Sequence, residues 1–397
     1  MGRVLYVSGS IGLGHAARDV AIARALRQIE ANLEIVFLAG DPARRLIADA
    51  GETVLPEAAE IGDESTIAEG SAEGFSLNLM SYGRRARRVF AKTIETFNRV
   101  SDKYPYDLLI GDETYEIWFA MAREPEMKRA PFTMIYDFVG YDAMSRNPID
   151  HAMAYLGNWG WAGGRKQKPS PADLTLFVGE PEDVDDRRFG LGLPNRRVFA
   201  LRNYEFVGYV FPFDPGAYAN PAEVRASLGY DDRPLIVCSI GGTAVGGDLL
   251  RLCAESYPHV AARLDHPRMV LVCGPRVDPD SLDVPAGVEV CSYVDKLHEH
   301  LAACDVAVVH AGGTTTLELT ALRRPFIYFP LENHFEQNVV VAKRLARHRA
   351  GVGMRYSATS PERLADKLVE LDGSDVTWPP IPSDGANRSA KLISRLL

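Results

Sequence analysis

A histidine and a glutamate eight positions apart flank a glycine turn in the last third of the chain. His310 ends a run of four apolar residues, which is long enough for a short buried strand. Gly312 and Gly313 have no Cβ, so their N–H groups can approach an anion closely. Glu318 lies one turn into the helix that we expect to follow, where its carboxylate can accept from two neighbouring hydroxyls. The pattern indicates a site for a diphosphate and a ribose.

The helix after this turn is expected to open with Thr314, Thr315 and Thr316. The unpaired N–H groups of a first helical turn and the positive end of the helix dipole favour negative charge, and His310 can donate to a phosphate oxygen. An alternative stays open, because Thr315 and Glu318 also match a capping box. In a capping box the glutamate folds back onto the helix N-terminus and binds no ligand.

The same order of strand, glycine turn and helix begins the chain. Residues 3–8 predict a buried strand, and Gly9, Gly12 and Gly14 form a flexible turn. His15 then starts a segment with apolar residues at helical spacing.

A third copy of this order lies past the middle of the chain, where an apolar run is followed by Gly241, Gly242 and Thr243. Openings about 230 residues apart predict two α/β domains of similar build, each starting its own parallel sheet. The length of 397 residues agrees, because it exceeds what one hydrophobic core usually supports.

The elements between these turns position further chemistry. The apolar run 107–112 predicts a strand that carries Asp112 to its C-terminal end, the edge of an open α/β sheet at which ligands bind. Other strands are expected at 34–38, 53–55, 132–136, 235–239, 269–273, 288–291, 306–309 and 326–329. Helices are expected at 15–26, 42–50 and 76–104.

Three segments are interpreted from composition. The arginines of the helix at 76–104 favour a solvated face, and a contact to an anionic acceptor or membrane surface is the alternative. The segment 141–168, with Tyr155, Trp159 and Trp161, is expected to be an irregular specificity region, and its aromatic part, 141–161, is expected to form an acceptor wall. The prolines and glycine of 206–221 indicate an interdomain linker.

The composition excludes several classes of protein. Hydrophobic residues at 46% and charged residues at 24% are typical of a globular protein, and a net charge of −9 argues against a nucleic-acid binder. No apolar run reaches the ~18–20 residues that span a bilayer, so we expect neither a membrane anchor nor a signal peptide. The five cysteines include no C-x-x-C pair, which predicts reduced thiols in a cytoplasmic protein.

Together the motifs resemble the GT-B glycosyltransferases, particularly the nucleotide-sugar-dependent inverting families. These families include the UDP-glycosyltransferases and the N-acetylglucosaminyltransferase of peptidoglycan synthesis. The resemblance rests on Gly-x-x-Gly-x-Gly-His at 9–15 and on His-Ala-Gly-Gly-Thr-Thr-Thr-Leu-Glu at 310–318. It implies an α/β fold of two Rossmann-like, doubly wound parallel-sheet domains facing across a cleft.

The resemblance also implies a division of labour. Residues 1–212 would bind the acceptor, residues 213–375 the donor, and the tail 376–397 would pack back on the first domain. The implied reaction moves a sugar, with inversion, from a UDP- or dTDP-sugar to a hydroxyl of a small molecule, lipid or saccharide. No cofactor, metal or nucleic acid is implied beyond the nucleotide-sugar co-substrate. The acceptor stays unidentified, and because an amphipathic acceptor is included, peripheral membrane contact stays open.

Donor contacts follow from the resemblance residue by residue. The main chain at Tyr293 and Val294 would pair with the base, and Glu318 would take the ribose hydroxyls. His310 would hold the diphosphate together with the glycine turns. The residues of these turns are Gly12, Gly14, Gly241, Gly242, Thr243, Gly312, Gly313, Thr314 and Thr315.

The loop 330–338 resembles the donor-sugar loop, and its length is closer to that of the peptidoglycan enzyme than to that of the UDP-glycosyltransferases. Gln337 and Asn338 are the implied contacts to sugar hydroxyls, with Glu332 and Glu336 next. The chain departs from the family at Glu336, which replaces an aspartate, and just after the loop, where Val-Ala stands for Asn-Ala. The identity of the sugar therefore stays open.

An inverting transfer needs a base for the acceptor proton. His15 is the candidate, because an imidazole with a pKa near its ordinary value of about 6.5 can accept a proton at neutral pH. Asp112 could orient this imidazole and stabilise its protonated form. Two plainer interpretations stay open: His15 could only bind phosphate or cap its helix, and Asp112 could be a polar strand end.

Two Asp-x-Asp pairs, Asp183 with Asp185 and Asp278 with Asp280, match the pattern of metal-dependent glycosyltransferases. Neither follows a strand in a glycine turn, so we expect surface loops and no metal site. Two other function classes stay open: a nonhydrolysing sugar-nucleotide 2-epimerase of similar two-domain build, and a catalytically silent nucleotide-sugar-binding protein that needs no base.

Overall fold

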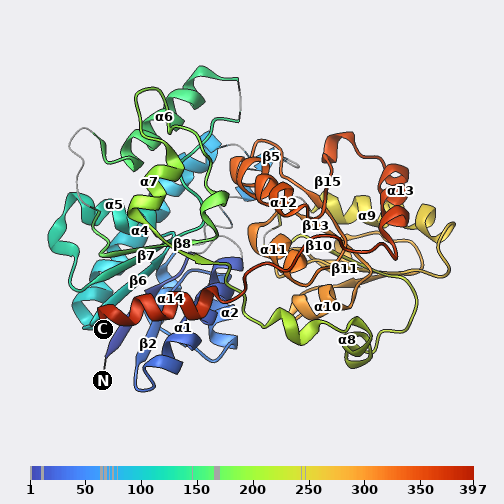
Figure 1. The fold of residues 1–397 in the computed structure, drawn as a ribbon, viewed down its shortest axis with the longest axis horizontal. Coiled ribbons are helices and arrows are strands. Elements are labelled where there is room, and N and C mark those ends of the chain that lie inside the picture. The colour runs from blue at the N-terminus through green and yellow to red at the C-terminus, as the bar shows by residue number, and fades with distance from the viewer. Residues whose placement is uncertain are drawn as a thin grey trace. The chain divides into compact units, whose positions relative to one another are not determined.

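The computed structural model describes residues 2–9, 13–62, 66, 69–70, 72–73, 76–77, 79–144, 146–164, 170–242, 244–245 and 247–397. Its chain divides into two compact units (Figure 1). The first comprises Met1–Ile67, Leu79–Phe213 and Pro382–Leu397. The second comprises Ala68–Asn78 and Asp214–Ile381, so that a short piece of the N-terminal half groups with the C-terminal half.

The first unit is built on a seven-stranded parallel sheet in the order β3-β2-β1-β6-β7-β8-β9. Because β1 lies between β2 and β6, the strand order reverses there, which makes the carboxyl ends of β1 and β6 a topological switch point. The strands are β1 Arg3–Val7, β2 Glu34–Leu38, β3 Thr53–Val54, β6 Leu108–Asp112, β7 Phe132–Tyr136, β8 Leu174–Val178 and β9 Glu205–Gly208.

The second unit repeats this plan with a six-stranded parallel sheet in the order β12-β11-β10-β13-β14-β15. Its switch point lies between β10 and β13. The strands are β10 Leu235–Ser239, β11 Arg268–Val272, β12 Val288–Cys291, β13 Val306–His310, β14 Phe326–Phe329 and β15 Val352–Gly353. A separate antiparallel pair is formed by β4 Ala72–Glu73 and β5 Ser76–Leu77.

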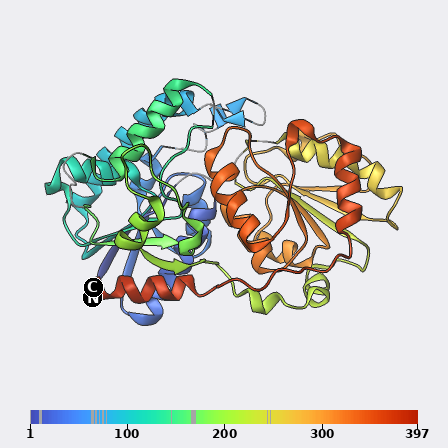
Figure 2. The same cartoon turned by 45° about the horizontal axis from the view of Figure 1, so that its top comes forward.

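Helices of the first unit bury two apolar clusters against its sheet. One cluster includes α1 and the C-terminal helix α14, which pack against each other although they come from opposite ends of the chain (Figure 2). The helices are α1 Gly14–Ile29, α2 Ala43–Asp49, α4 Leu79–Lys103, α5 Tyr115–Arg123, α6 Pro148–Trp161, α7 Arg196–Asn203 and α14 Gly385–Ile393.

In the second unit α9 packs against α13 and α8 packs against α10. Its helices are α8 Pro221–Leu228, α9 Asp248–Ala261, α10 Leu297–Ala303, α11 Gly313–Ala321, α12 Ala342–His348 and α13 Pro361–Leu371. A π-helix, η7 Glu336–Val341, leads directly into α12. Among the described residues, no helix is long and apolar enough to cross a membrane.

All ten expected strands are found within one residue of their predicted ends, but three expectations were incomplete or wrong. The segment 141–168 is not irregular, because it contains α6. Asn147 caps that helix by accepting from the N–H of Ile149 at 3.0 Å, and Pro148 occupies its first turn. Strand β8 was not predicted, and the start of the expected linker is the edge strand β9, which pairs with β8.

Candidate active site

The first switch point brings His15 and Asp112 together. Val7 of β1 is in register with Gly111 of β6, so α1 begins beside the end of β6. Nδ1 of His15 lies 3.2 Å from Oδ2 of Asp112. The two residues that sequence analysis paired are therefore neighbours, and their roles stay a prediction.

Arg18, one turn along α1, is a member of this site that sequence reasoning missed. Its Nε donates to Oδ2 of Asp112 at 2.7 Å and its Nη2 donates to Oδ1 at 2.5 Å. Its Nη1 donates to Oδ2 of Asp137, just after β7, at 2.7 Å. Nη2 also lies 2.8 Å from Nδ1 of His15. The carboxylate expected to serve His15 is thus held at both oxygens by an arginine.

Neighbouring charges determine the protonation of Asp112 and His15. Burial would raise the pKa of Asp112, but Arg18 and His15 lower that pKa to about 2, so Asp112 is ionised at neutral pH. Burial and Arg18 lower the pKa of His15, whereas Asp112 and Asp137 raise it, and the net pKa is above the usual 6.5. His15 therefore keeps its proton to a higher pH than a free imidazole.

The second switch point places His310 and the glycine turn side by side. His310 is the last residue of β13 and is 7% exposed. A Cβ added to Gly312 would meet no atom within 4 Å, so the backbone there is open to a ligand. Gly312 is also the N-cap of α11, and no side chain caps that helix. The first-turn amides, which include those of Thr314 and Thr315, lie where a phosphate could bind.

Glu318 is buried in α11 with an exposure of 8%. Since α11 carries no side-chain cap, the predicted alternative of a capping box is not formed. Burial raises the pKa of Glu318 to about 8, so its carboxyl is largely protonated at neutral pH. A protonated carboxyl both donates and accepts, which suits a pair of hydroxyls.

The turn after β10 contains a contact that sequence analysis did not foresee. Gly241 adopts a φ of 79°, the left-handed region open to glycine. The carboxylate of Glu69 accepts from the N–H of Ala244 at 2.9 Å. The same carboxylate accepts from Nε and Nη2 of Arg276 at 2.5 and 2.8 Å. The turn expected to hold a diphosphate therefore already binds an anion from the protein itself.

Several predicted donor residues lie elsewhere or outside the description. Gly12 and Thr243 lie outside the described residues. Gly14 starts α1 in the first unit, whereas Gly241, Gly242, Gly312 and Gly313 are in the second. Tyr293 is 46% exposed and follows β12 after one residue.

The predicted donor-sugar loop is held in shape by its own polar side chains. Oε1 of Gln337 accepts from the N–H of Leu331 at 2.8 Å. Nδ2 of Asn338 donates to the carbonyls of Leu331 and His334 at 2.7 and 2.8 Å. Gln337 and Asn338 lie in the π-helix η7, an irregularity frequent at functional sites. The side chains of Gln337 and Asn338 therefore hold the loop in shape, a role that was not expected from the sequence.

The two acidic candidates in this loop differ in placement. A Cβ on Gly313 would lie 3.7 Å from Oε1 of Glu336, so Glu336 reaches the glycine turn. Glu332 is half-buried beside Asn333, whose φ of 63° turns the loop sharply. Glu336 is thus the better placed of the two for a donor.

Residues 236–392 match the family model of the glycosyltransferase family 28 C-terminal domain. An uncharacterized glycosyltransferase of Methanopyrus kandleri is 28% identical over 195 residues, 48% of this chain and 54% of that protein. A UDP-N-acetylglucosamine–N-acetylmuramyl-(pentapeptide) pyrophosphoryl-undecaprenol N-acetylglucosamine transferase of Carboxydothermus hydrogenoformans is 27% identical over 161 residues, 38% of this chain and 42% of that protein. The chain spans about half or less of the length of these curated relatives.

Solved structures are similar over the whole chain. The glycosyltransferase SnogD from Streptomyces nogalater superposes with a TM-score of 0.59 at 18% identity, covering 100% of both chains. The glycosyltransferase VinC in complex with dTDP gives 0.58 at 17% identity, covering 99% of this chain and 94% of that one. The protein has the GT-B fold. The fold class expected from the motifs is confirmed.

The remaining candidate sites of this GT-B protein are engaged in local contacts. Asp183 accepts from the hydroxyl of Tyr209 at 2.8 Å, and Asp185 accepts from Arg187 at 2.8 Å. Asp278 caps a short 3₁₀ helix. Within the described part of the chain, no three His, Cys, Asp or Glu side chains gather as a metal site.

The aromatic segment expected as an acceptor wall divides in two. The rings of Tyr141 and Trp161 pack together with centroids 5.3 Å apart, and Nε1 of Trp161 donates to the hydroxyl of Tyr204 at 2.8 Å. These two residues therefore belong to the packing of the unit. Tyr155 and Trp159, each 40% exposed, are the members that remain accessible.

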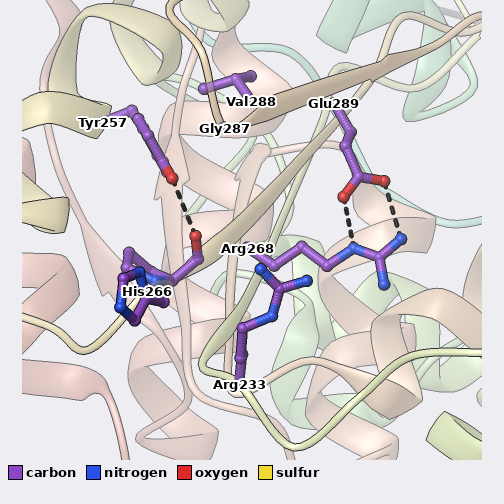
Figure 3. A pocket seen from close by; sticks show the side chains of 8 residues that line it. Arg233, Tyr257, His266, Arg268, Gly287, Val288 and Glu289 are labelled. Carbon is purple, nitrogen blue, oxygen red and sulfur yellow. Dashed lines mark hydrogen bonds and ion pairs between the residues drawn. The ribbon is translucent and has the colours of Figure 1, made fainter.

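A cavity of about 370 Å³ in the second unit is lined by residues at the amino ends of β11 and β12 (Figure 3). It opens at Arg268, the first residue of β11, whereas the donor residues follow the carboxyl ends of strands. Arg268 donates to both oxygens of Glu289 at 2.5 and 2.9 Å. This cavity lies at the opposite edge of the sheet from the switch point and is no candidate for the donor site.

Proposed function

We propose that this protein is an inverting glycosyltransferase that uses a UDP- or dTDP-sugar and a hydroxyl-bearing acceptor, without a metal ion. The observation that carries the proposal is the second switch point. There an uncapped helix N-terminus, the open backbone of Gly312 and the buried Glu318 lie within nine residues of His310. The match to the family 28 C-terminal domain supports the same assignment.

Donor binding follows from the chemistry of these groups. The amides at the start of α11 and His310 would donate to the diphosphate, whose charge grows as the sugar leaves. The protonated carboxyl of Glu318 would donate to one ribose hydroxyl and accept from the other. Gln337, Asn338 and Glu336 would shape the loop that receives the sugar.

The chemical step belongs to the first unit. Nε2 of His15 would take the proton of the acceptor hydroxyl as that oxygen bonds to the anomeric carbon. The bond from that carbon to the diphosphate oxygen breaks on the opposite face, and its electron pair leaves with the diphosphate. The configuration at the carbon is thereby inverted. Tyr155 and Trp159 offer accessible aromatic surface for an acceptor in this unit.

A screen of UDP- and dTDP-sugars by thermal shift, followed by turnover assays, tests the proposal. Diphosphate released only when an acceptor is present supports a transferase. A new sugar isomer without acceptor would instead indicate the 2-epimerase, and binding without turnover would indicate a silent binding protein. The family match and the solved relatives named above are all glycosyltransferases, so neither alternative is favoured.

A further inference from the structure

Glu113 lies in the first site, but neither the sequence motifs nor the proposed reaction uses it. It follows Asp112 at the end of β6, and its φ of 52° lies in the left-handed region, which is rare for a side chain of this kind. Oε2 of Glu113 lies 3.9 Å from Nε2 of His15. Its Oε1 accepts from the N–H of Asp137 at 3.4 Å. Strained backbone of this sort persists where neighbouring structure enforces it, often at functional sites.

His15 therefore faces a different environment at each ring nitrogen. Nδ1 faces Arg18 at 2.8 Å and Asp112 at 3.2 Å. Nε2, the atom that would take the acceptor proton, faces the carboxyl of Glu113. A carboxylate on the Nε2 side is the one placed to interact with a proton that arrives there.

Arg18 limits how far Asp112 can stabilise that proton. Both of its oxygens already accept from Arg18, and Arg18 has no acceptor atom and keeps its charge. Arg18 lowers the pKa of His15, whereas Asp112 raises it through both its charge and its hydrogen bond. Arg18 therefore offsets part of the stabilisation that Asp112 gives to the protonated imidazole.

We propose that Glu113 is the carboxylate that stabilises protonated His15 during transfer, and that Asp112 serves as the fixed partner of Arg18. The inference rests on the proposed function. When the acceptor O–H bond breaks, its proton bonds to Nε2 of His15, and the Glu113 carboxylate balances the new positive charge. Glu113 is a positioning residue in this account, because it acts through His15.

Glu113 and His15 are near enough to titrate as an interacting pair. Burial and the charge of Asp137 raise the pKa of Glu113 well above its usual range, whereas the charge of Arg18 lowers it. The charged or titratable groups around the pair come from several elements. They are Arg18 of α1, Asp112 of β6, Tyr115 of α5, Tyr136 of β7, Asp137 after β7, and Tyr141.

The test is an NMR titration of the His15 imidazole in the full-length protein, with its signal assigned by loss in His15→Gln. The variant Glu113→Asn removes the carboxylate, and asparagine tolerates the left-handed backbone, so the fold is expected to be kept. We expect the pKa of His15 to fall by about one unit, as for the loss of a carboxylate within ~4–6 Å. Glu126→Asn, which removes an exposed acid of the same unit, should leave the titration unchanged.

A second readout is the pH profile of kcat with a nucleotide sugar and acceptor. Glu113→Asn should move its acidic limb to lower pH and lower kcat, whereas Glu113→Asp should restore part of both. An unchanged pKa of His15 in folded Glu113→Asn would overturn the proposal, whatever the activity. A shifted pKa in a protein without transferase activity would keep the charge pair and reject the proposed function.

Discussion

The two switch points of this protein solve different electrostatic problems. At the first, Arg18 is bonded to two ionised carboxylates, so buried charges are paired within the protein. At the second, Glu318 is buried and largely uncharged, and the start of α11 has no capping side chain. The first site therefore already pairs its charges with partners from the protein, and its net charge depends on whether His15 is protonated. The second site offers hydrogen-bond donors to which an anion could bind.

Glu69 sharpens this contrast. Its carboxylate accepts a hydrogen bond from a backbone N–H of the turn after β10 and forms an ion pair with Arg276. An anion is therefore stable at this turn even in the free protein, because a charged acceptor forms strong hydrogen bonds with an arginine and a backbone amide. A donor diphosphate that uses the same turn would have to displace it.

The largest effect is expected at the proposed base. His15→Ala should lower kcat by roughly 10²–10⁴-fold, the usual contribution of a general base, and leave the Kd for UDP unchanged. Turnover assays and isothermal titration calorimetry measure the two quantities separately. A variant that transfers sugar at the wild-type rate would show that His15 is not the base.

Substitution of Arg18 shows whether its ion pairs with Asp112 and Asp137 stabilise the first site. Arg18→Met leaves Asp112 and Asp137 buried without their cation, which should lower the free energy of unfolding by about 3–5 kcal/mol. Arg24→Met, on an exposed position of the same helix, is the matched control and should change it little. Equal denaturation midpoints for both variants would contradict the comparison.

Glu318 tests the second site through ligand affinity. Glu318→Ala should weaken UDP binding by roughly 10-fold or more, because it leaves two ribose hydroxyls without a partner. Glu318→Gln, which resembles the protonated carboxyl, should bind more tightly than Glu318→Ala. Isothermal titration calorimetry at neutral pH measures these affinities for UDP. Equal affinity of wild type and Glu318→Ala would show that Glu318 does not contact the donor.

The same residue predicts a pH dependence of stability. The folded pKa of Glu318, about 8, lies above the usual 4.5, so its neutral form is the one that stabilises the fold. That contribution is complete below pH 4.5 and is lost as the pH rises toward about 8. Glu318→Gln should therefore be increasingly more stable than wild type over this interval, as measured by denaturant unfolding without ligand. A constant difference would show that Glu318 does not titrate in this way.

The smallest effect is expected at Glu69. Glu69→Gln removes the carboxylate charge that now accepts from the N–H of Ala244 and from Arg276. With less competition from this charge, the affinity for UDP should rise by roughly 3- to 10-fold, about 0.7–1.4 kcal/mol. Glu73→Gln, in the same segment, serves as a control for the loss of charge. No change in affinity would mean that the diphosphate binds elsewhere than at this turn.

Much of the fold could be predicted because buried parallel strands leave a local signal. The strands β7, β10 and β14 are runs of apolar residues, and their ends were found as predicted. The helix α6 was missed since its glycines resemble a loop, although the Asn-Pro pair before it is a helix-start signal. The edge strand β9 was taken for linker, because prolines follow it closely.

The candidate sites were predictable to different depths. His15 and Asp112 each lie at or just after the carboxyl end of an expected strand. Because such ends meet at one edge of a parallel sheet, their contact could be predicted from the sequence. Glu113 carries no such signal, because its importance depends on a positive φ and on the ring it faces. The contact of Glu69 with Arg276 joins residues 207 positions apart, a separation that no local pattern describes.

The amino-acid sequence by itself determined the repeated order of strand, glycine turn and helix, since apolar runs and glycines act on the backbone within a few residues. Only the tertiary structure decided which carboxyl groups are charged. Whether Asp112 ionises, Glu318 stays neutral or Glu69 binds a turn depends on burial and on partners brought from distant parts of the chain. Electrostatic free energies depend on distances in space, and the folded chain sets those distances.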